Sequence, residues 1–166
     1  MADIKDSKIF ESIEGIRQLK DVLVVLVKTE WNAGIVDELE NGCRRIFSEY
    51  GIRSITITVP GAVEIPFAIR QCWSVNQSAS AFIAFGCVIR GGTPHFEYVC
   101  DSVTSGITQL NLSLTVPVIY GLLTVDNMQQ AEERIGGVHG HKGEEAAVTA
   151  LKMMIISQQL KEGLIP

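Results

Sequence analysis

The chain has 166 residues, of which 46% are hydrophobic and 20% charged, and its 14 Lys and Arg against 19 Asp and Glu give a formal net charge of -5. This length suits one core without a second independent domain, and the apolar fraction is too high for a disordered chain. So few cations argue against nucleic-acid binding, and the longest apolar run, residues 22–27, is far shorter than a membrane span.

The chain begins with a segment that has little periodicity. In residues 1–20 charged side chains alternate with isolated apolar ones, so we expect a loosely attached arm ahead of a single domain at residues 21–166. Residues 22–27 form a continuous β-branched run, which is typical of a strand covered on both faces. In residues 33–50 the apolar positions recur at helical spacing, which predicts a helix.

The alternation of strand and helix repeats three more times along the chain. Strands are predicted at residues 54–59, 79–89 and 116–123, and helices at residues 60–75, 95–112, 127–135 and 144–160, the last two separated by a glycine-rich break at residues 136–143. Strands joined by helical crossovers form a parallel sheet with helices on its faces. We therefore predict an α/β three-layer sandwich with a four-stranded parallel sheet, of the flavodoxin-like kind.

Ligands in such sheets bind beyond the carboxyl ends of the strands, so the loops that follow the strands are the candidate functional segments. Residues 86–93 superficially match a nucleotide phosphate loop, but Gly92 stands where the lysine is needed, which argues against an NTPase. Two glycines, Thr93 and the start of a helix still suit a phosphate. A plain turn between strand and helix explains the same residues.

Other candidates have two interpretations each. His95 follows the phosphate-like loop, where it could shuttle protons or be structural. Trp31 could stack on a flat ring or cover the end of the sheet, and Glu64 could bind ligand hydroxyls or favour the start of a helix. Arg134 and Lys142 could neutralise phosphate or be solvated. Spacing alone leaves these alternatives open.

Four cysteines lie at irregular intervals without a paired motif, and there are only three histidines. We therefore expect no metal site, and reduced, mostly buried thiols in a cytoplasmic protein. His139 and His141 flank glycines in the break, and we expect them to be loop residues.

Several segments carry a resemblance that is more specific than any single loop. They are residues 59–66, 86–99, 120–124 and 130–134, followed by 140–147. Over residues 22–154 the chain closely resembles the 6,7-dimethyl-8-ribityllumazine synthase family, with the segments in the family's order and spacing. Four residues depart from its pattern. Trp31 and Tyr120 stand where phenylalanine is common and keep the aromatic face, Glu30 stands where arginine is common, and His141 replaces the usual asparagine.

The resemblance implies a transferase of riboflavin biosynthesis. Such an enzyme condenses 5-amino-6-(D-ribitylamino)uracil with 3,4-dihydroxy-2-butanone 4-phosphate to 6,7-dimethyl-8-ribityllumazine, and needs no cofactor or metal. The residues that match the family's pyrimidine site are Trp31, Asn32, Ala62, Val63, Glu64, Cys87, Val88, Ile89 and Tyr120. Gly92, Thr93 and Arg134 match its phosphate site, and His95, Arg134 and Lys142 match its catalytic groups.

The resemblance also implies an assembly. Family members form pentamers, in many cases built into 60-subunit icosahedral capsids, and a neighbouring subunit supplies the residues that match Tyr120 and Arg134. Riboflavin synthase is a possible partner, whereas no nucleic acid or membrane is expected. The alternative is a non-catalytic flavin- or lumazine-binding or shell protein on the same scaffold. A flavodoxin-like FMN carrier fits poorly, because residues 28–32 lack a hydroxyl-rich phosphate loop.

Overall fold

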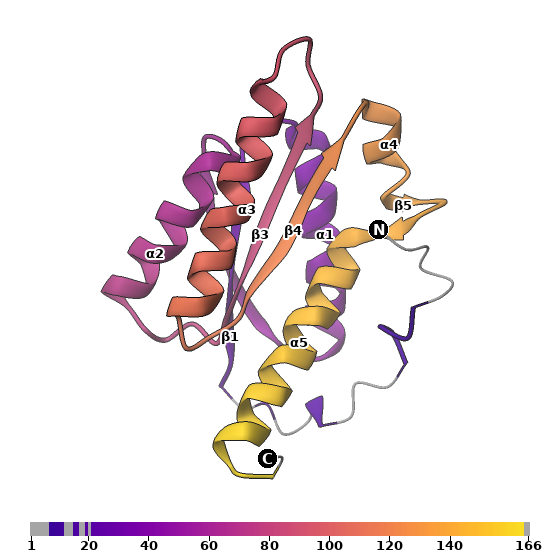
Figure 1. The fold of residues 1–166 in the computed structure, drawn as a ribbon. Helices are drawn as coiled ribbons and strands as arrows, with labels where there is room; N and C mark the ends of the chain where they lie inside the picture. The colour runs from indigo at the N-terminus through magenta and orange to yellow at the C-terminus, as the bar shows by residue number, and fades with distance from the viewer. Residues whose placement is uncertain (1–6, 12–14, 17–18, 20, 165–166) are drawn as a thin grey trace.

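The computed structural model describes residues 7–11, 15–16, 19 and 21–164, and it places one sheet between two layers of helices (Figure 1). The strands of the sheet are β1 (Leu23–Thr29), β2 (Arg53–Val59), β3 (Ala81–Ile89) and β4 (Val118–Val125), in the order β2-β1-β3-β4. All three pairings are parallel, which confirms the predicted three-layer α/β sandwich. The predicted arm lies largely outside the described residues, and its separation from the domain stays a prediction.

The helices follow the strands as the sequence predicts. They are α1 (Ala33–Glu49), α2 (Ile65–Val75), α3 (His95–Ser113), α4 (Met128–Glu132) and α5 (Lys142–Lys161), with a 3-10 turn, η3 (Ala62–Glu64), ahead of α2. A proline in the first turn of α2 suits a helix start, because its missing N–H would have no helical partner there.

The sheet separates two hydrophobic cores. One face packs against α1 and α5, and the other against α2 and α3. The central strand β3 supplies both, with Ile83 and Phe85 on the first face and Phe82 and Ala84 on the second. Since its side chains are buried on both sides, β3 is an unbroken apolar run rather than an alternating one.

The glycine-rich segment is more ordered than a simple break. The helix before it ends at Glu132, and an antiparallel hairpin follows, made of β5 (Ile135–Gly137) and β6 (Gly140–His141). Gly136 and Gly140 have φ angles of 116° and 76°, which glycine adopts without steric cost. The prediction that His141 is a loop residue is therefore wrong, because it lies in β6 and is buried.

The expectation of mostly buried thiols is confirmed for half of the cysteines. All four are free; Cys43 and Cys87 are buried, and Cys72 and Cys100 are half-buried. Within the described residues, no cluster of three or more His, Cys, Asp and Glu side chains is arranged to hold a metal ion. None of the described helices is both long and apolar enough to cross a membrane.

Candidate active site

A cavity of about 520 Å³ opens at the carboxyl ends of β1, β2 and β3, and we call it the loop cavity. Its walls come from the loops after these strands and from the start of α3. The lining residues are Thr29, Trp31, Asn32, Gly61, Ala62, Val63, Glu64, Cys87, Val88, Ile89, His95 and Val99. All predicted pyrimidine contacts except Tyr120 are in this set, together with His95.

The loop after β1 presents an aromatic face to the loop cavity. Asn32 adopts a left-handed conformation with φ of 56°, and its side-chain Nδ2 donates a hydrogen bond of 2.8 Å to the Cys87 carbonyl. Thr29 Oγ1 donates to the Trp31 carbonyl at 3.2 Å. Trp31 is 73% exposed, so its backbone is held while its indole is free to stack on a ligand.

The turn after β2 brings a carboxylate beside this indole. A Cβ atom at Gly61 would lie 3.0 Å from Glu64 Oε2 and 3.6 Å from Trp31 Cδ1. Any side chain at Gly61 would therefore crowd the space between the two groups. Glu64 is exposed at the cavity, where its carboxylate can accept hydrogen bonds from ligand hydroxyls.

Cys87 lines the loop cavity without offering a nucleophile. Burial raises the pKa of its thiol to about 11, so the thiol is neutral near pH 7. Its carbonyl accepts the Asn32 side-chain amide, which joins the β1 loop to the end of β3. This residue therefore shapes the wall of the cavity rather than reacting.

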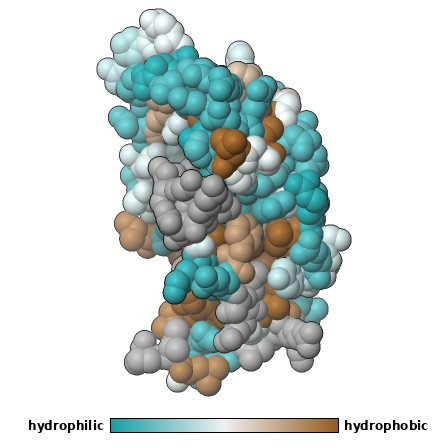
Figure 2. Space-filling model, turned by 90° about the vertical axis from the view of Figure 1, so that its right-hand side faces the viewer, coloured by the Kyte–Doolittle hydropathy of each residue, from teal (hydrophilic) through white to brown (hydrophobic). Residues whose placement is uncertain are grey.

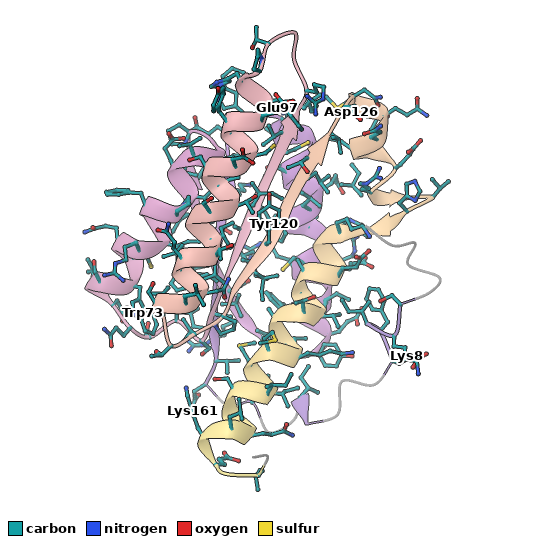
Figure 3. All side chains as sticks on the ribbon, in the orientation of Figure 1. Lys8, Trp73, Glu97, Tyr120, Asp126 and Lys161 are labelled. Atoms are coloured by element: carbon teal, nitrogen blue, oxygen red, sulfur yellow. The ribbon has the colours of Figure 1, made fainter. Side chains whose placement is uncertain are left out.

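The phosphate-like loop is exposed between β3 and α3. Gly92 and Thr93 line neither this cavity nor the one described below, but they lie close to His95, which begins α3. Arg90, at the base of the loop, forms ion pairs with two carboxylates. Its Nε donates to Asp126 at 2.9 Å, and its guanidinium also pairs with Glu97. Both carboxylate residues are labelled in Figure 3.

These ion pairs lower the pKa of both carboxyl groups at the base of the loop, Glu97 and Asp126. The Arg90 guanidinium also lies 4.2 Å from the centre of the Phe96 ring. Its charge is therefore engaged on protein groups, which leaves backbone amides and Thr93 to receive an anion.

A second cavity of about 580 Å³ runs along the sheet edge at β4, and we call it the edge cavity. It is lined by Ile9, by every residue of β4, and by Arg134, Lys142, Glu145, Ala146 and Thr149. Tyr120 lies in the middle of β4, with its hydroxyl 3.2 Å from Thr104 Oγ1 (Figure 3). Figure 2 looks onto this side of the molecule, where hydrophobic residues lie among hydrophilic ones.

Two cationic side chains border the edge cavity, and they differ in burial and in their hydrogen-bond partners. Arg134 Nη1 donates to the Gln130 carbonyl at 2.7 Å, and its side chain is 24% exposed. Lys142 is buried, and its Nζ contacts both oxygens of Glu145 at 2.7 and 2.8 Å. A solvated Lys142, one of the two interpretations of the sequence, is therefore wrong.

The structure thus divides the predicted site residues other than Gly92 and Thr93 between two cavities of one chain. Tyr120, Arg134 and Lys142 line the edge cavity, apart from the set around Trp31 and His95. Sequence reasoning did not single out Thr29, Gly61, Val99 or Glu145. Helical spacing could have indicated two of them, since Val99 lies four residues after His95 and Glu145 three after Lys142.

The fold and the loop cavity define an α/β protein that binds small ligands where the strands of a parallel sheet end. The family model of 6,7-dimethyl-8-ribityllumazine synthase matches residues 21–158.

Individual relatives carry the same description. The chain is 46% identical over 135 residues to a 6,7-dimethyl-8-ribityllumazine synthase of Parabacteroides distasonis, covering 80% of this chain and 84% of that one. It is 48% identical over 137 residues to the Porphyromonas gingivalis protein of the same description, covering 81% and 84%. For the Phocaeicola vulgatus protein, also so described, the figures are 42% over 156 residues, covering 92% and 90%. The chain therefore belongs to the 6,7-dimethyl-8-ribityllumazine synthase family.

Proposed function

We infer that the chain is a transferase that condenses 5-amino-6-(D-ribitylamino)uracil with 3,4-dihydroxy-2-butanone 4-phosphate. The products are 6,7-dimethyl-8-ribityllumazine, inorganic phosphate and water, in the penultimate step of riboflavin biosynthesis. Family membership supports this reaction. The observation that carries it is the loop cavity, in which an exposed indole, a carboxylate and an imidazole line one space of ligand size.

The two ends of the pyrimidine substrate suit different walls of the loop cavity. Trp31 stacks on the flat ring, while Glu64 accepts hydrogen bonds from the ribityl hydroxyls. Cys87, Val88 and Ile89 border the ring where β3 ends, and backbone groups at a strand end can pair with the polar edge of a pyrimidine. Positioning of this kind supplies much of the acceleration of a reaction between two bound substrates.

The chemical steps need proton transfers and a site for the departing phosphate. An amine of the pyrimidine attacks the ketone and a first water leaves to give an imine. Elimination of phosphate then gives an enol, which tautomerises to a ketone, and the second amine attacks this carbonyl carbon and closes the ring as its oxygen leaves as a second water. His95 transfers protons in these steps, from its place at the start of α3. Thr93, the N-terminus of α3 and Arg134 stabilise the phosphate. No step requires oxidation or reduction, so we expect neither a cofactor nor a metal.

We propose that each complete active site joins the loop cavity of one subunit to the edge cavity of its neighbour. Two surfaces of the chain support a head-to-tail contact. The edge strand β4 has a neighbour in the sheet on one side only. Large apolar side chains stand exposed on the opposite helix layer: Phe67 on α2 is 72% exposed, and Tyr98 and Leu112 on α3 are 73% and 84% exposed. Heterologous contacts of this kind form a ring when the rotation between neighbouring subunits closes, and we propose that it closes here.

The finer assembly follows the family resemblance. We propose a pentamer, in which Tyr120, Arg134 and Lys142 complete the neighbour's site, and the pentamers can build a 60-subunit capsid. Riboflavin synthase is the proposed partner of such a capsid, in the cytoplasm. The non-catalytic alternative predicts loss of the acid-base or phosphate groups, yet His95, Thr93 and Arg134 are all present.

The direct test is to mix the purified protein with both substrates and follow the fluorescence of the lumazine formed. We expect a rate proportional to protein concentration and well above the spontaneous reaction. The double variant Trp31→Ala and His95→Ala, expressed and purified in the same way, is the control: activity that remains in it comes from a contaminating enzyme. Product formation at the spontaneous rate, with the wild-type protein correctly folded, would refute the enzymatic function.

A further inference from the structure

His141 is buried in a way that leaves both of its ring nitrogens without a partner among the described residues. The residue is 7% exposed, and neither Nδ1 nor Nε2 has a hydrogen-bond donor or acceptor in reach. A buried unpaired polar atom ordinarily costs about 1–3 kcal/mol. The environment of the ring is therefore suited to its shape and poorly suited to an added proton and charge.

The ring rests directly on the backbone of α1. A Cβ atom at Gly42 would lie 2.1 Å from His141 Cε1 and 2.5 Å from Nδ1, so only glycine leaves room for the imidazole. Two residues after His141, a Cβ at Gly143 would lie 2.0 Å from the Leu39 carbonyl oxygen. The hairpin and the start of α5 thus meet α1 at two glycines. We call the contact between His141 and Gly42 the imidazole seat.

The imidazole seat anchors the hairpin that carries both cations of the edge cavity. His141 pairs with Ile135 across the hairpin, and the Lys142 backbone N–H donates to the Arg134 carbonyl at 2.9 Å. Arg134 immediately precedes β5, and Lys142 immediately follows β6. A shift of the hairpin away from α1 would therefore move the backbone at both cations together.

We propose that His141 is a positioning residue: its neutral imidazole, seated on Gly42, holds the β5–β6 hairpin so that Arg134 and Lys142 border the edge cavity, and uptake of a proton by the ring releases the hairpin. The effect of hairpin release on catalysis rests on the proposed function. The imidazole seat and the release of the hairpin are independent of that function.

The charges around the imidazole seat set the direction of the pH effect. Burial lowers the pKa of His141 below the ordinary 6.5, and Arg45 on α1 adds to this effect. Glu144 on α5, Glu38 on α1 and the backbone of His141 itself oppose it, but burial outweighs them. Arg45 and Glu144 pair with each other at 3.0 Å.

His139, the other histidine of the hairpin, lies 3.8 Å from Glu133 at the end of α4, and neither group contributes to the pKa shift of His141. Since the released ring binds a proton more readily than the seated one, the seat is intact above about pH 6.5 and loses stability as the pH falls below that value. The ratio of seated to released protein falls by about tenfold for each unit by which seating lowers the pKa, once the pH lies below both values.

Hydrogen exchange of the assembled protein tests the release without any substrate. Amide protection in residues 133–143 is compared at about pH 7.5 and about pH 5, after correction for intrinsic exchange. Wild-type protection should fall at the lower pH, whereas His141→Phe, which keeps an aromatic ring and cannot take a proton, should hold it. His139→Phe is the matched control, because that side chain is 41% exposed on the same hairpin, and it should behave as wild type.

Two further outcomes decide the proposal. Gly42→Ala should displace the ring and leave the hairpin poorly protected at both pH values, and it is informative even where His141→Phe folds poorly. Equal wild-type protection at both pH values, or a pH-dependent loss in His141→Phe as large as in wild type, would overturn the proposal.

Kinetics then test the link to catalysis. On acidification, the wild-type KM for the butanone phosphate should rise several-fold more than that of His141→Phe, while the KM for the pyrimidine changes equally in both. The phosphate group of the substrate titrates in the same way in assays of wild type and of His141→Phe. A difference between their KM profiles therefore comes from the protein. Identical KM profiles would refute the positioning role. Absence of turnover in every variant would instead count against the proposed function, with the exchange result still deciding the seat.

Discussion

The Arg134 side chain is fixed by a hydrogen bond to the backbone, and its charge remains available to bind a ligand. Its Nη1 donates to the Gln130 carbonyl at 2.7 Å, and the nearest carboxylate oxygen, of Glu133, is 3.9 Å from that nitrogen. The guanidinium is thus tethered from behind by a neutral acceptor, with its charge only weakly compensated. An arginine in this state is suited to binding a phosphate dianion at the edge cavity.

Replacing Arg134 by alanine should therefore separate the two substrates. We expect the KM for the butanone phosphate to rise on the order of 10- to 100-fold, since one charge-assisted contact contributes roughly 1.5–3 kcal/mol. The KM for the pyrimidine should change little, and Arg134→Lys should restore part of the loss. Arg53→Ala, at an exposed residue of β2, is the control for altered net charge. Equal losses for both substrates would show that the phosphate role is wrong.

Individual site residues were predictable where chain position alone determines their surroundings. Trp31, Glu64 and His95 follow strands of a parallel sheet, so their meeting at one end of it follows from the topology. The environment of Lys142 did not follow, because its burial depends on how α5 packs against β4. The burial of His141 was missed for a similar reason, since the space for its ring exists only because Gly42 lies opposite.

At the scale of elements, a polar network joins α1 to the two strands beside it. Glu40 is buried, and its carboxylate accepts hydrogen bonds from Lys28 Nζ at 2.6 Å, Arg44 Nε at 2.8 Å and Thr56 Oγ1 at 2.6 Å. Burial alone would raise the pKa of Glu40, but the hydrogen bonds from Lys28, Thr56 and Arg44 outweigh it and lower the pKa to about 2. The network therefore stabilises the ionised carboxylate and ties α1 to β1 and β2.

Glu40→Gln should lower the free energy of unfolding at pH 7 by roughly 2–4 kcal/mol, as a pKa lowered from 4.5 to about 2 implies. Because the folded-state pKa is lowered, this contribution is complete above pH 4.5 and is lost as the pH falls towards 2. Urea denaturation at pH 7 and at about pH 3 should show a smaller difference between variant and wild type at the lower pH. Glu49→Gln, exposed at the end of α1, is the control. A difference that does not depend on pH would contradict this account.

Two glycines at equivalent helix positions allow a matched test of how α5 packs on α1. Gly34 and Gly143 are each the second residue of their helix, but a Cβ at Gly34 has no atom within 4 Å, whereas one at Gly143 would lie 2.0 Å from the Leu39 carbonyl oxygen. Gly143→Ala should lower the midpoint of thermal unfolding, with a cost of about 1–3 kcal/mol from overpacking. Gly34→Ala should leave it unchanged or raise it, because alanine favours a helix. Similar midpoints for the two variants would contradict the close approach.

The helices and strands could be predicted wherever burial imposes a recognisable pattern of apolar residues on the sequence. The unbroken apolar run of β3 and the helical spacing in α1 both result from packing on the sheet. The β5–β6 hairpin has no such pattern, because its strands are two and three residues long and rich in glycine. Its order comes from contacts with α5 and with α1, which is distant in sequence, so periodicity predicted only a break.

At the scale of the whole molecule, the described part of the chain has two cavities that share no lining residue, and we propose that each is half of an active site. The loop cavity opens where β1, β2 and β3 end, and the edge cavity follows β4. We therefore propose that a second copy of the chain brings Arg134 to the substrates that Trp31 and His95 contact.

Solution mass should reflect this requirement. For a chain of 18.2 kDa, light scattering should give about 91 kDa for a pentamer or about 1.1 MDa for a 60-subunit capsid. Phe67→Glu and Leu112→Glu, which place charges on the exposed apolar helix layer, should shift the mass towards the single chain and reduce turnover with it. A fully active protein of about 18 kDa would contradict the shared site.

Complementation between two inactive variants tests the central claim most directly. One chain carries Trp31→Ala and His95→Ala in the loop cavity, and the other carries Arg134→Ala at the edge cavity. Each assembled alone should be nearly inactive when the butanone phosphate is kept near the wild-type KM, well below the raised KM of Arg134→Ala. Co-expressed in equal amounts, they should regain about one quarter of wild-type turnover, because in a random head-to-tail ring that fraction of contacts joins two intact halves. A co-assembled mixture as inactive as either variant alone would contradict an active site shared between neighbouring subunits.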